Sequence, residues 1–165
     1  MRRSRRRSDE ILARSLQQPE RLMPPIHTPE DDATRSRLGV APGCRVWLGG
    51  HNRSATRRIE PLLGGAARPP GGPVDLAFVA PRTMDEAIYF AEKIRSRLAA
   101  DGRIWIVSSA NAERDENTAS VEPAAARFDR AALRDAMTAL GMHECDVIDL
   151  GDAYRAAAYA PRRSD

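Results

Sequence analysis

The sequence predicts an α/β fold with a mainly parallel sheet and an antiparallel hairpin at its C-terminal end. Three observations predict it: continuous apolar runs, helical stripes between them that begin with capping residues, and two final strand-like runs on either side of a tight turn. Continuous apolar runs are typical of strands that a parallel sheet buries on both faces. Because parallel strands need crossover connections, the alternation with helices favours parallel pairing.

The first helix and the first strand are marked by their boundaries. Thr28 is the expected cap, Pro29 takes the first helical position, and three acidic residues follow near the positive end of the helix dipole. Gly39 ends the helix. The run CRVWLGG then predicts a buried strand centred on Val46.

The middle of the chain predicts a short connection, a second strand and a second helix. Pro61 excludes a long helix after the first strand, because a helix interior does not tolerate proline, so regular structure is expected only around residues 60–63. The run VDLAFVAP predicts a strand centred on Leu76. Thr83 and Glu86 form a capping box for the helix that follows. Its expected apolar stripe consists of Ala87, Ala91, Ile94 and Leu98, with Gly102 just past its end.

The last third predicts a strand, a long loop, a helix and the hairpin. RIWIVSS is a strand centred on Ile104, and the polar stretch after it is the loop. A helical face ending before Gly141 follows. Gly151-Asp152 is the turn between two antiparallel strands centred on Val147 and Ala157.

Length and composition favour a single domain with a flexible tail. The chain has 165 residues, enough for one domain with a real core. We expect residues 1–27 to be a basic tail and linker and residues 28–162 to be the domain. No apolar run approaches the ~20 residues of a membrane helix. The sequence holds no secretory signal and has two cysteines without a disulfide pattern, which predicts a cytoplasmic protein.

The basic charge belongs to the tail. The net charge is +3, and five arginines lie within the first seven residues, so the rest of the chain carries −2. Such a tip can bind nucleic acid or another anionic surface, and a solvated tail without a partner is the alternative. The arginines concerned are Arg2, Arg3, Arg5, Arg6 and Arg7.

Four stretches resemble the class I S-adenosylmethionine-dependent methyltransferases, which have a Rossmann-like fold. They are LGVAPGCRVWLGG for the first strand, PVDLAFVAP for the middle strand, RLAADGRIWIVSS for the next, and residues 142–160 for the closing hairpin. The LGV-x-PG opening, the LLG turn, the PxDL strand and the DG-x-IW strand are also similar to a bacterial family of small Rossmann-like proteins of unknown function. The resemblance covers about Leu38 to Arg162 and implies a methyltransferase-like fold.

The cofactor motif of that family is degenerate here. The resemblance implies an acid two residues before a G-x-G-x-G loop and a second acid at the end of the next strand. Trp47 stands where the first acid belongs, and GGAARPPGGP contains no carboxylate for the second. Cofactor binding in the family's mode is therefore not expected, and S-adenosylmethionine is retained as the alternative. The loop that follows the strand consists of Gly49, Gly50, His51, Asn52 and Arg53. Of the three glycines in the G-x-G-x-G pattern, it keeps only the first.

Any small ligand is expected at the carboxyl ends of the parallel strands, where open α/β sheets form their crevice. The expected residues hold no carboxylate, so the crevice favours an anionic guest over the sulfonium cation of S-adenosylmethionine. No catalytic residue is assigned, and His143 with Cys145 does not make a metal site. The predicted set is Gly49, Gly50, His51, Asn52 and Arg53 after the first strand, Pro81, Arg82 and Thr83 after the second, and Ser108, Ser109 and Asn111 after the third.

Three classes of function follow from these observations. The main hypothesis is a non-catalytic Rossmann-like protein that acts as a binding or regulatory module. The alternatives are a divergent S-adenosylmethionine-dependent methyltransferase and a small-anion or nucleotide-binding protein.

Overall fold

The structure, a computed structural model, describes residues 29–68, 71–109, 129–151 and 154–162. The strands of these residues form one sheet in the order β1-β2-β3-β5-β4. β1, β2 and β3 run parallel, whereas β5 is antiparallel to both β3 and β4. The predicted fold class is therefore confirmed. The strands are β1 (Val46–Gly49), β2 (Val74–Val79), β3 (Leu98–Ser109), β4 (Met142–Gly151) and β5 (Tyr154–Pro161).

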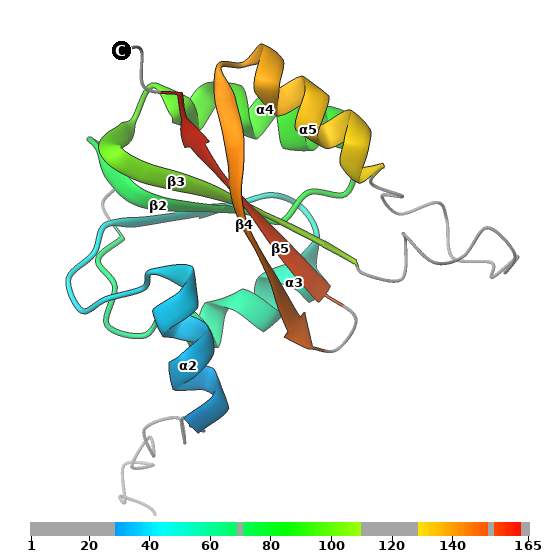
Figure 1. Cartoon of the computed structure of the whole chain (residues 1–165). Coiled ribbons are helices and arrows are strands. Elements are labelled where there is room, and N and C mark those ends of the chain that lie inside the picture. The colour runs from blue at the N-terminus through cyan, green and yellow to red at the C-terminus, as the bar shows by residue number, and fades with distance from the viewer. Residues whose placement is uncertain (1–28, 69–70, 110–128, 152–153, 163–165) are drawn as a thin grey trace, which may run out of the picture.

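Helices cover both faces of the sheet, as Figure 1 shows. α2 and α3 pack on one face together with a short 3-10 helix, and α4 and α5 lie on the other face. This layering follows from the crossover connections that join parallel strands. The helices are α2 (Pro29–Leu38), α3 (Arg53–Ile59), the 3-10 helix η1 (Glu60–Leu63), α4 (Met84–Arg95) and α5 (Arg130–Ala139).

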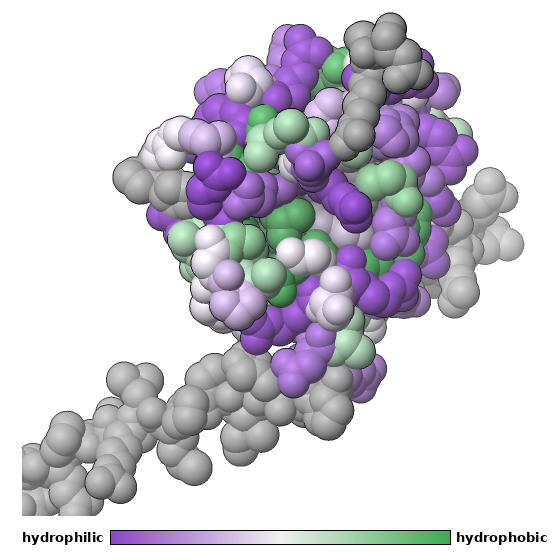
Figure 2. All heavy atoms as spheres, turned by 60° about the vertical axis from the view of Figure 1, so that its left-hand side comes forward, coloured by the Kyte–Doolittle hydropathy of each residue, from purple (hydrophilic) through white to green (hydrophobic). Residues whose placement is uncertain are grey.

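Alternate residues of the strands build a separate apolar core on each face. Phe78 and Trp105 face α2 and α3, whereas Val79 and Ile104 face α4 and α5. The Trp105 indole N–H donates to the Leu38 carbonyl at 3.1 Å, which ties α2 to the sheet. Hydrophilic residues surround the hydrophobic ones that reach the surface on the side seen in Figure 2.

The connection after β1 holds more helix than predicted. α3 occupies Arg53–Ile59, directly after the loop, whereas only a turn around residues 60–63 was expected. The Asn52 side chain starts α3 by accepting a hydrogen bond from the Ala55 amide. Pro61 then stands in the first turn of η1, where its missing N–H costs nothing, so proline ends α3 without preventing it.

β3 begins earlier than predicted. Leu98 was expected on the helical stripe of α4, but α4 ends at Arg95 and Leu98 pairs with Val74 of β2. The register then shifts before Leu76 pairs with Arg103, and residues 99–102 form the irregularity. Apolar spacing alone favoured the helix, and strand pairing overrides it.

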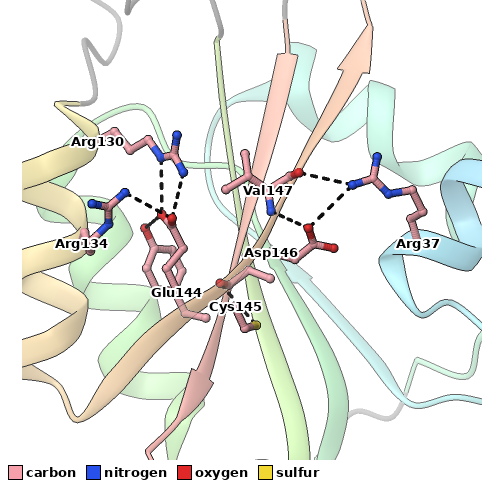
Figure 3. Close-up of polar contacts among 9 residues, drawn as sticks. Arg37, Arg130, Arg134, Glu144, Cys145, Asp146 and Val147 are labelled. Carbon is pink, nitrogen blue, oxygen red and sulfur yellow. Dashed lines mark hydrogen bonds and ion pairs between the residues drawn. The ribbon is translucent and has the colours of Figure 1, made fainter.

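The C-terminal hairpin is confirmed, and a bulge in β4 sends two acidic side chains to opposite faces. The register shifts between Glu144, opposite Tyr159, and Asp146, opposite Ala158, with Cys145 in the bulge. Figure 3 shows Glu144 pointing towards α5 and Asp146 pointing away from α5.

Side chains also bind three backbone groups of β4. The Val147 amide donates to the Asp146 carboxylate at 2.7 Å, and Arg37 donates to the Val147 carbonyl at 3.4 Å (Figure 3). Further along the strand, Arg58 donates to the Leu150 carbonyl at 2.7 Å.

Several sequence predictions lie outside the described residues. They concern the tail with its arginines, the cap Thr28, the long loop with Asn111, and Asp152 of the hairpin turn. In the part of the chain that the structure describes, no helix has the length and apolar character needed to cross a membrane.

Candidate functional site

The loops that follow β1 and β2 are joined by their backbones. The Ala80 amide donates to the Gly49 carbonyl at 2.8 Å, and the Asn52 amide donates to the Ala80 carbonyl at 2.9 Å. These bonds continue the parallel pairing of β1 with β2 past the ends of both strands. The two loops are therefore joined at the carboxyl edge of the sheet.

Both glycines of the first loop make room for the protein's own atoms. Gly50 has a φ of +109°, and a Cβ there would lie 2.2 Å from the Ala80 carbonyl oxygen. At Gly49 a Cβ would lie 2.1 Å from Cη2 of the Trp47 indole. Glycine is required at position 50, where the φ is positive and the close atoms are backbone, whereas a Cβ at position 49 would require the Trp47 indole to move.

A carboxylate lies in this crevice, contrary to the sequence prediction. Glu86 Oε1 accepts hydrogen bonds from the His51 amide at 2.8 Å and from His51 Nδ1 at 2.5 Å, and Oε2 accepts one from the Arg82 amide at 2.8 Å. Only 11% of the Glu86 side chain is exposed, against 70% for His51. Because Nδ1 donates to the carboxylate, the imidazole presents Nε2 to solvent.

The predicted capping box is half correct. Thr83 caps α4 by accepting from the Glu86 amide at 3.2 Å. The Glu86 carboxylate, however, bonds to Arg82 and to His51 in the neighbouring loop, and the structure gives it no bond to the Thr83 amide. The glutamate thus fixes two loops as well as the helix start.

The remaining predicted residues divide into two groups. Arg53 and Arg82 are exposed beside the joined loops, and no partner for either guanidinium is found within the described ranges. Ser108 and Ser109 end β3, where they pair with Arg155 and Tyr154 of β5. The structure thus brings the first-loop residues and Arg82 together through Ala80 and Glu86, and it gives the serines no bond to them.

An aromatic cluster borders the crevice on the α4 side. The Phe90 ring lies 5.6 Å from that of Trp47 and 6.0 Å from the His51 ring, centroid to centroid. Tyr89 packs edge-on against Phe90, and the Lys93 ammonium lies 4.5 Å from the centre of the Tyr89 ring. Phe90 thus packs against the indole ring that lies over Gly49.

A cavity of about 340 Å³ lies beside β1. It shares Gly49 and Gly50 with the predicted site, but its other polar residues were missed by sequence reasoning. Glu60 and Arg68 form an ion pair at 3.8 Å, and both side chains are exposed. No spacing in the sequence marks them, because the fold alone brings residue 68 back to β1. The lining residues are Val46, Trp47, Leu48, Gly49, Gly50, Thr56, Glu60 and Arg68.

Within the described ranges, no three metal-binding side chains come together. His143 and Cys145 are exposed, and the bulge at Cys145 breaks the simple alternation that would put both on one face. Asp75, the acid that opens β2, is bound to Arg45 Nη2 at 2.5 Å and to the Arg45 amide at 2.8 Å. It joins the amino ends of β1 and β2, far along the strands from the crevice.

Comparison with solved structures finds methyltransferases with a similar fold. The CcbJ methyltransferase from Streptomyces caelestis is similar with a TM-score of 0.51 and 12% identity over 82% of this chain and 97% of that one. At this identity the likeness is one of fold. The architecture is thus a methyltransferase-like mixed sheet, parallel from β1 to β3 and antiparallel at its C-terminal strands.

Two further methyltransferases are similar at lower scores. A TehB-like S-adenosylmethionine-dependent methyltransferase from Corynebacterium glutamicum has a TM-score of 0.47 and 11% identity, over 94% of this chain and 98% of that one. Magnesium protoporphyrin IX methyltransferase from Synechocystis has a TM-score of 0.49 and 12% identity, over 81% and 82%. No family model and no curated protein matches the sequence.

Proposed function

We propose that the protein is a non-catalytic binding or regulatory module on a methyltransferase-like fold, and that it does not bind S-adenosylmethionine in the manner of the class I enzymes. The main support for this proposal is that other atoms of the protein occupy the space beside the two loop glycines. In the family the loop glycines let the backbone approach the cofactor, whereas here the space at Gly49 is taken by the Trp47 indole and the space at Gly50 by the Ala80 carbonyl.

The acids that the cofactor would need also lack counterparts. Trp47 occupies the position of the acid that would orient the amino-acid end, and its ring packs against Phe90. The segment after η1 touches β1 at an isolated bridge between Arg45 and Ala67, and residues 64–73 contain no carboxylate for the ribose hydroxyls. The residues present therefore do not fit the cofactor in its usual mode, and no methyl-transfer step is derived.

The two alternatives have less support from the crevice. A divergent methyltransferase would need other residues to hold the cofactor. A small-anion or nucleotide-binding protein would need free backbone donors, but the amides of His51 and Arg82 are bonded to Glu86 and that of Asn52 to Ala80. Binding of nucleic acid through the N-terminal arginines stays a separate prediction.

Thermal unfolding with S-adenosylmethionine and with S-adenosylhomocysteine tests the proposal. A ligand at 100 times its dissociation constant stabilises a protein by about 2.7 kcal/mol, which raises the midpoint by roughly 8 °C for a chain of this size. We expect no shift from either compound at millimolar concentration, with an active methyltransferase as the positive control. A saturable rise would overturn the proposal and favour the methyltransferase alternative.

A further inference from the structure

We infer that Glu86 is an internal ligand: its carboxylate fills a carboxylate-binding site built by the loops after β1 and β2. Removal of this side chain should open the site to a free monocarboxylate such as formate or acetate. The inference concerns the native occupant of the crevice and does not depend on the proposed function.

The first argument is the number and origin of the donors. Three N–H groups converge on the carboxylate, the His51 amide and ring from one loop and the Arg82 amide from the other. A buried carboxylate is stable only when such charge-assisted hydrogen bonds replace its hydration. With 11% of the side chain exposed, Glu86 is held as a bound anion would be held.

The second argument is that bonds not made by Glu86 also join the two loops that carry the amide donors. The bonds from the Ala80 amide to Gly49 and from the Asn52 amide to Ala80 fix both loops, and the close contact of Gly50 with Ala80 fixes their separation. Asn52 is held further by its cap on α3. These backbone bonds remain when the carboxylate is removed, so the His51 and Arg82 amides stay close together and a ligand has only the His51 ring to order.

The chemistry of the site selects the ligand class. All three contacts are N–H donors, so the site takes an anionic acceptor, and the two Glu86 oxygens that they meet show that a planar carboxylate fits them. Formate has three non-hydrogen atoms, and the ceiling on affinity per atom sets its dissociation constant at roughly 1 mM or weaker. Acetate adds the methyl group that occupies the place of the deleted Glu86 side chain.

The test compares the variant Glu86→Ala with wild type and with Glu92→Ala, a matched exposed glutamate on the same helix. Thermal midpoints are measured against sodium formate and sodium acetate, with sodium chloride and sodium phosphate at equal ionic strength. We expect a saturable rise of the midpoint with both carboxylates in Glu86→Ala alone. In the amide NMR spectrum of this variant, the His51 and Arg82 signals should move with the same dissociation constant.

Two results would overturn the inference. One is an equal shift of the thermal midpoint of all three proteins with formate. An equal shift of Glu86→Ala with formate and with chloride counts in the same way, because it would show a general salt effect. The other result comes from wild type and can be obtained even where Glu86→Ala does not fold. In wild type, we expect the amides of His51 and Arg82 to exchange with solvent at least tenfold more slowly than unbonded loop amides. Exchange at the unbonded rate would show that Glu86 does not hold them.

Discussion

Replacing Glu144 by alanine should remove a contact that joins α5 to the C-terminal hairpin. The carboxylate accepts hydrogen bonds from Arg130 Nη2 at 2.8 Å and Arg134 Nη2 at 3.3 Å, and from the Tyr159 hydroxyl at 3.4 Å. Figure 3 shows both arginines reaching it from α5. Burial raises the pKa of Glu144, but the guanidiniums of Arg130 and Arg134 outweigh it and hold this pKa below its ordinary value.

The magnitude follows from the exposure of the partners. The arginine side chains are 37% and 50% exposed, so solvent screens the ion pairs and reduces their contribution to about 1 kcal/mol. Tyr159 is fully buried, and leaving a buried hydroxyl without a partner costs roughly 1–3 kcal/mol, at the lower end for a bond this long. Glu144→Ala should therefore lower the free energy of unfolding by about 2–3 kcal/mol.

Urea denaturation and thermal unfolding measure this loss, which corresponds to roughly 6–9 °C in the midpoint for 165 residues. Glu144→Gln keeps an acceptor for Tyr159 and should lose only about 1 kcal/mol. Glu92→Ala, on an exposed face of α4, should change stability by less than about 0.5 kcal/mol. Equal losses in the glutamine and alanine variants, or an alanine variant as stable as wild type, would refute the reasoning.

Two further predictions concern backbone strain and pH. Gly50→Ala places a Cβ 2.2 Å from the Ala80 carbonyl oxygen at a φ of +109°, and it should lower the free energy of unfolding in urea by more than about 3 kcal/mol. Gly71→Ala, with open space around it, should be nearly neutral. Similar losses of stability in both variants would contradict the close approach at Gly50. Because the pKa of Glu144 is lowered from 4.5 in the folded state, its contribution is complete above pH 4.5 and is lost as pH falls through the lowered value. Thermal midpoints below pH 4.5 should therefore decline less steeply in Glu144→Gln than in wild type, and parallel declines would exclude this carboxyl.

The strands were predictable because their signal is local. The five expected centres, from Val46 to Ala157, all lie within strands of the structure. The start of β3 was not predictable in this way, because Leu98 continues the helical spacing of α4 and only its pairing with Val74 assigns it to a strand. α3 was missed because the proline after it was given more weight than the cap at Asn52.

The sequence predicts which loops lie together, but it does not predict that Glu86 binds both of them. The carboxyl ends of parallel strands lie at one edge, which placed Gly50, His51 and Arg82 together in advance. Glu86 was visible as a helix-capping residue, yet its partner His51 is 35 positions away. Their contact exists because β1 pairs in parallel with β2, so it depends on the register of two strands and not on spacing along the chain.

The bonded backbone of β4 has a consequence for what can touch this end of the sheet. As the last strand in the order, β4 would ordinarily present unpaired N–H and C=O groups that invite another chain to extend the sheet. Asp146 and Arg37 already occupy those of Val147, and Arg58 occupies the Leu150 carbonyl. An added strand would have to displace Asp146 and Arg37 before it could pair with Val147, so a molecule that meets this edge at Val147 reaches charged side chains before backbone.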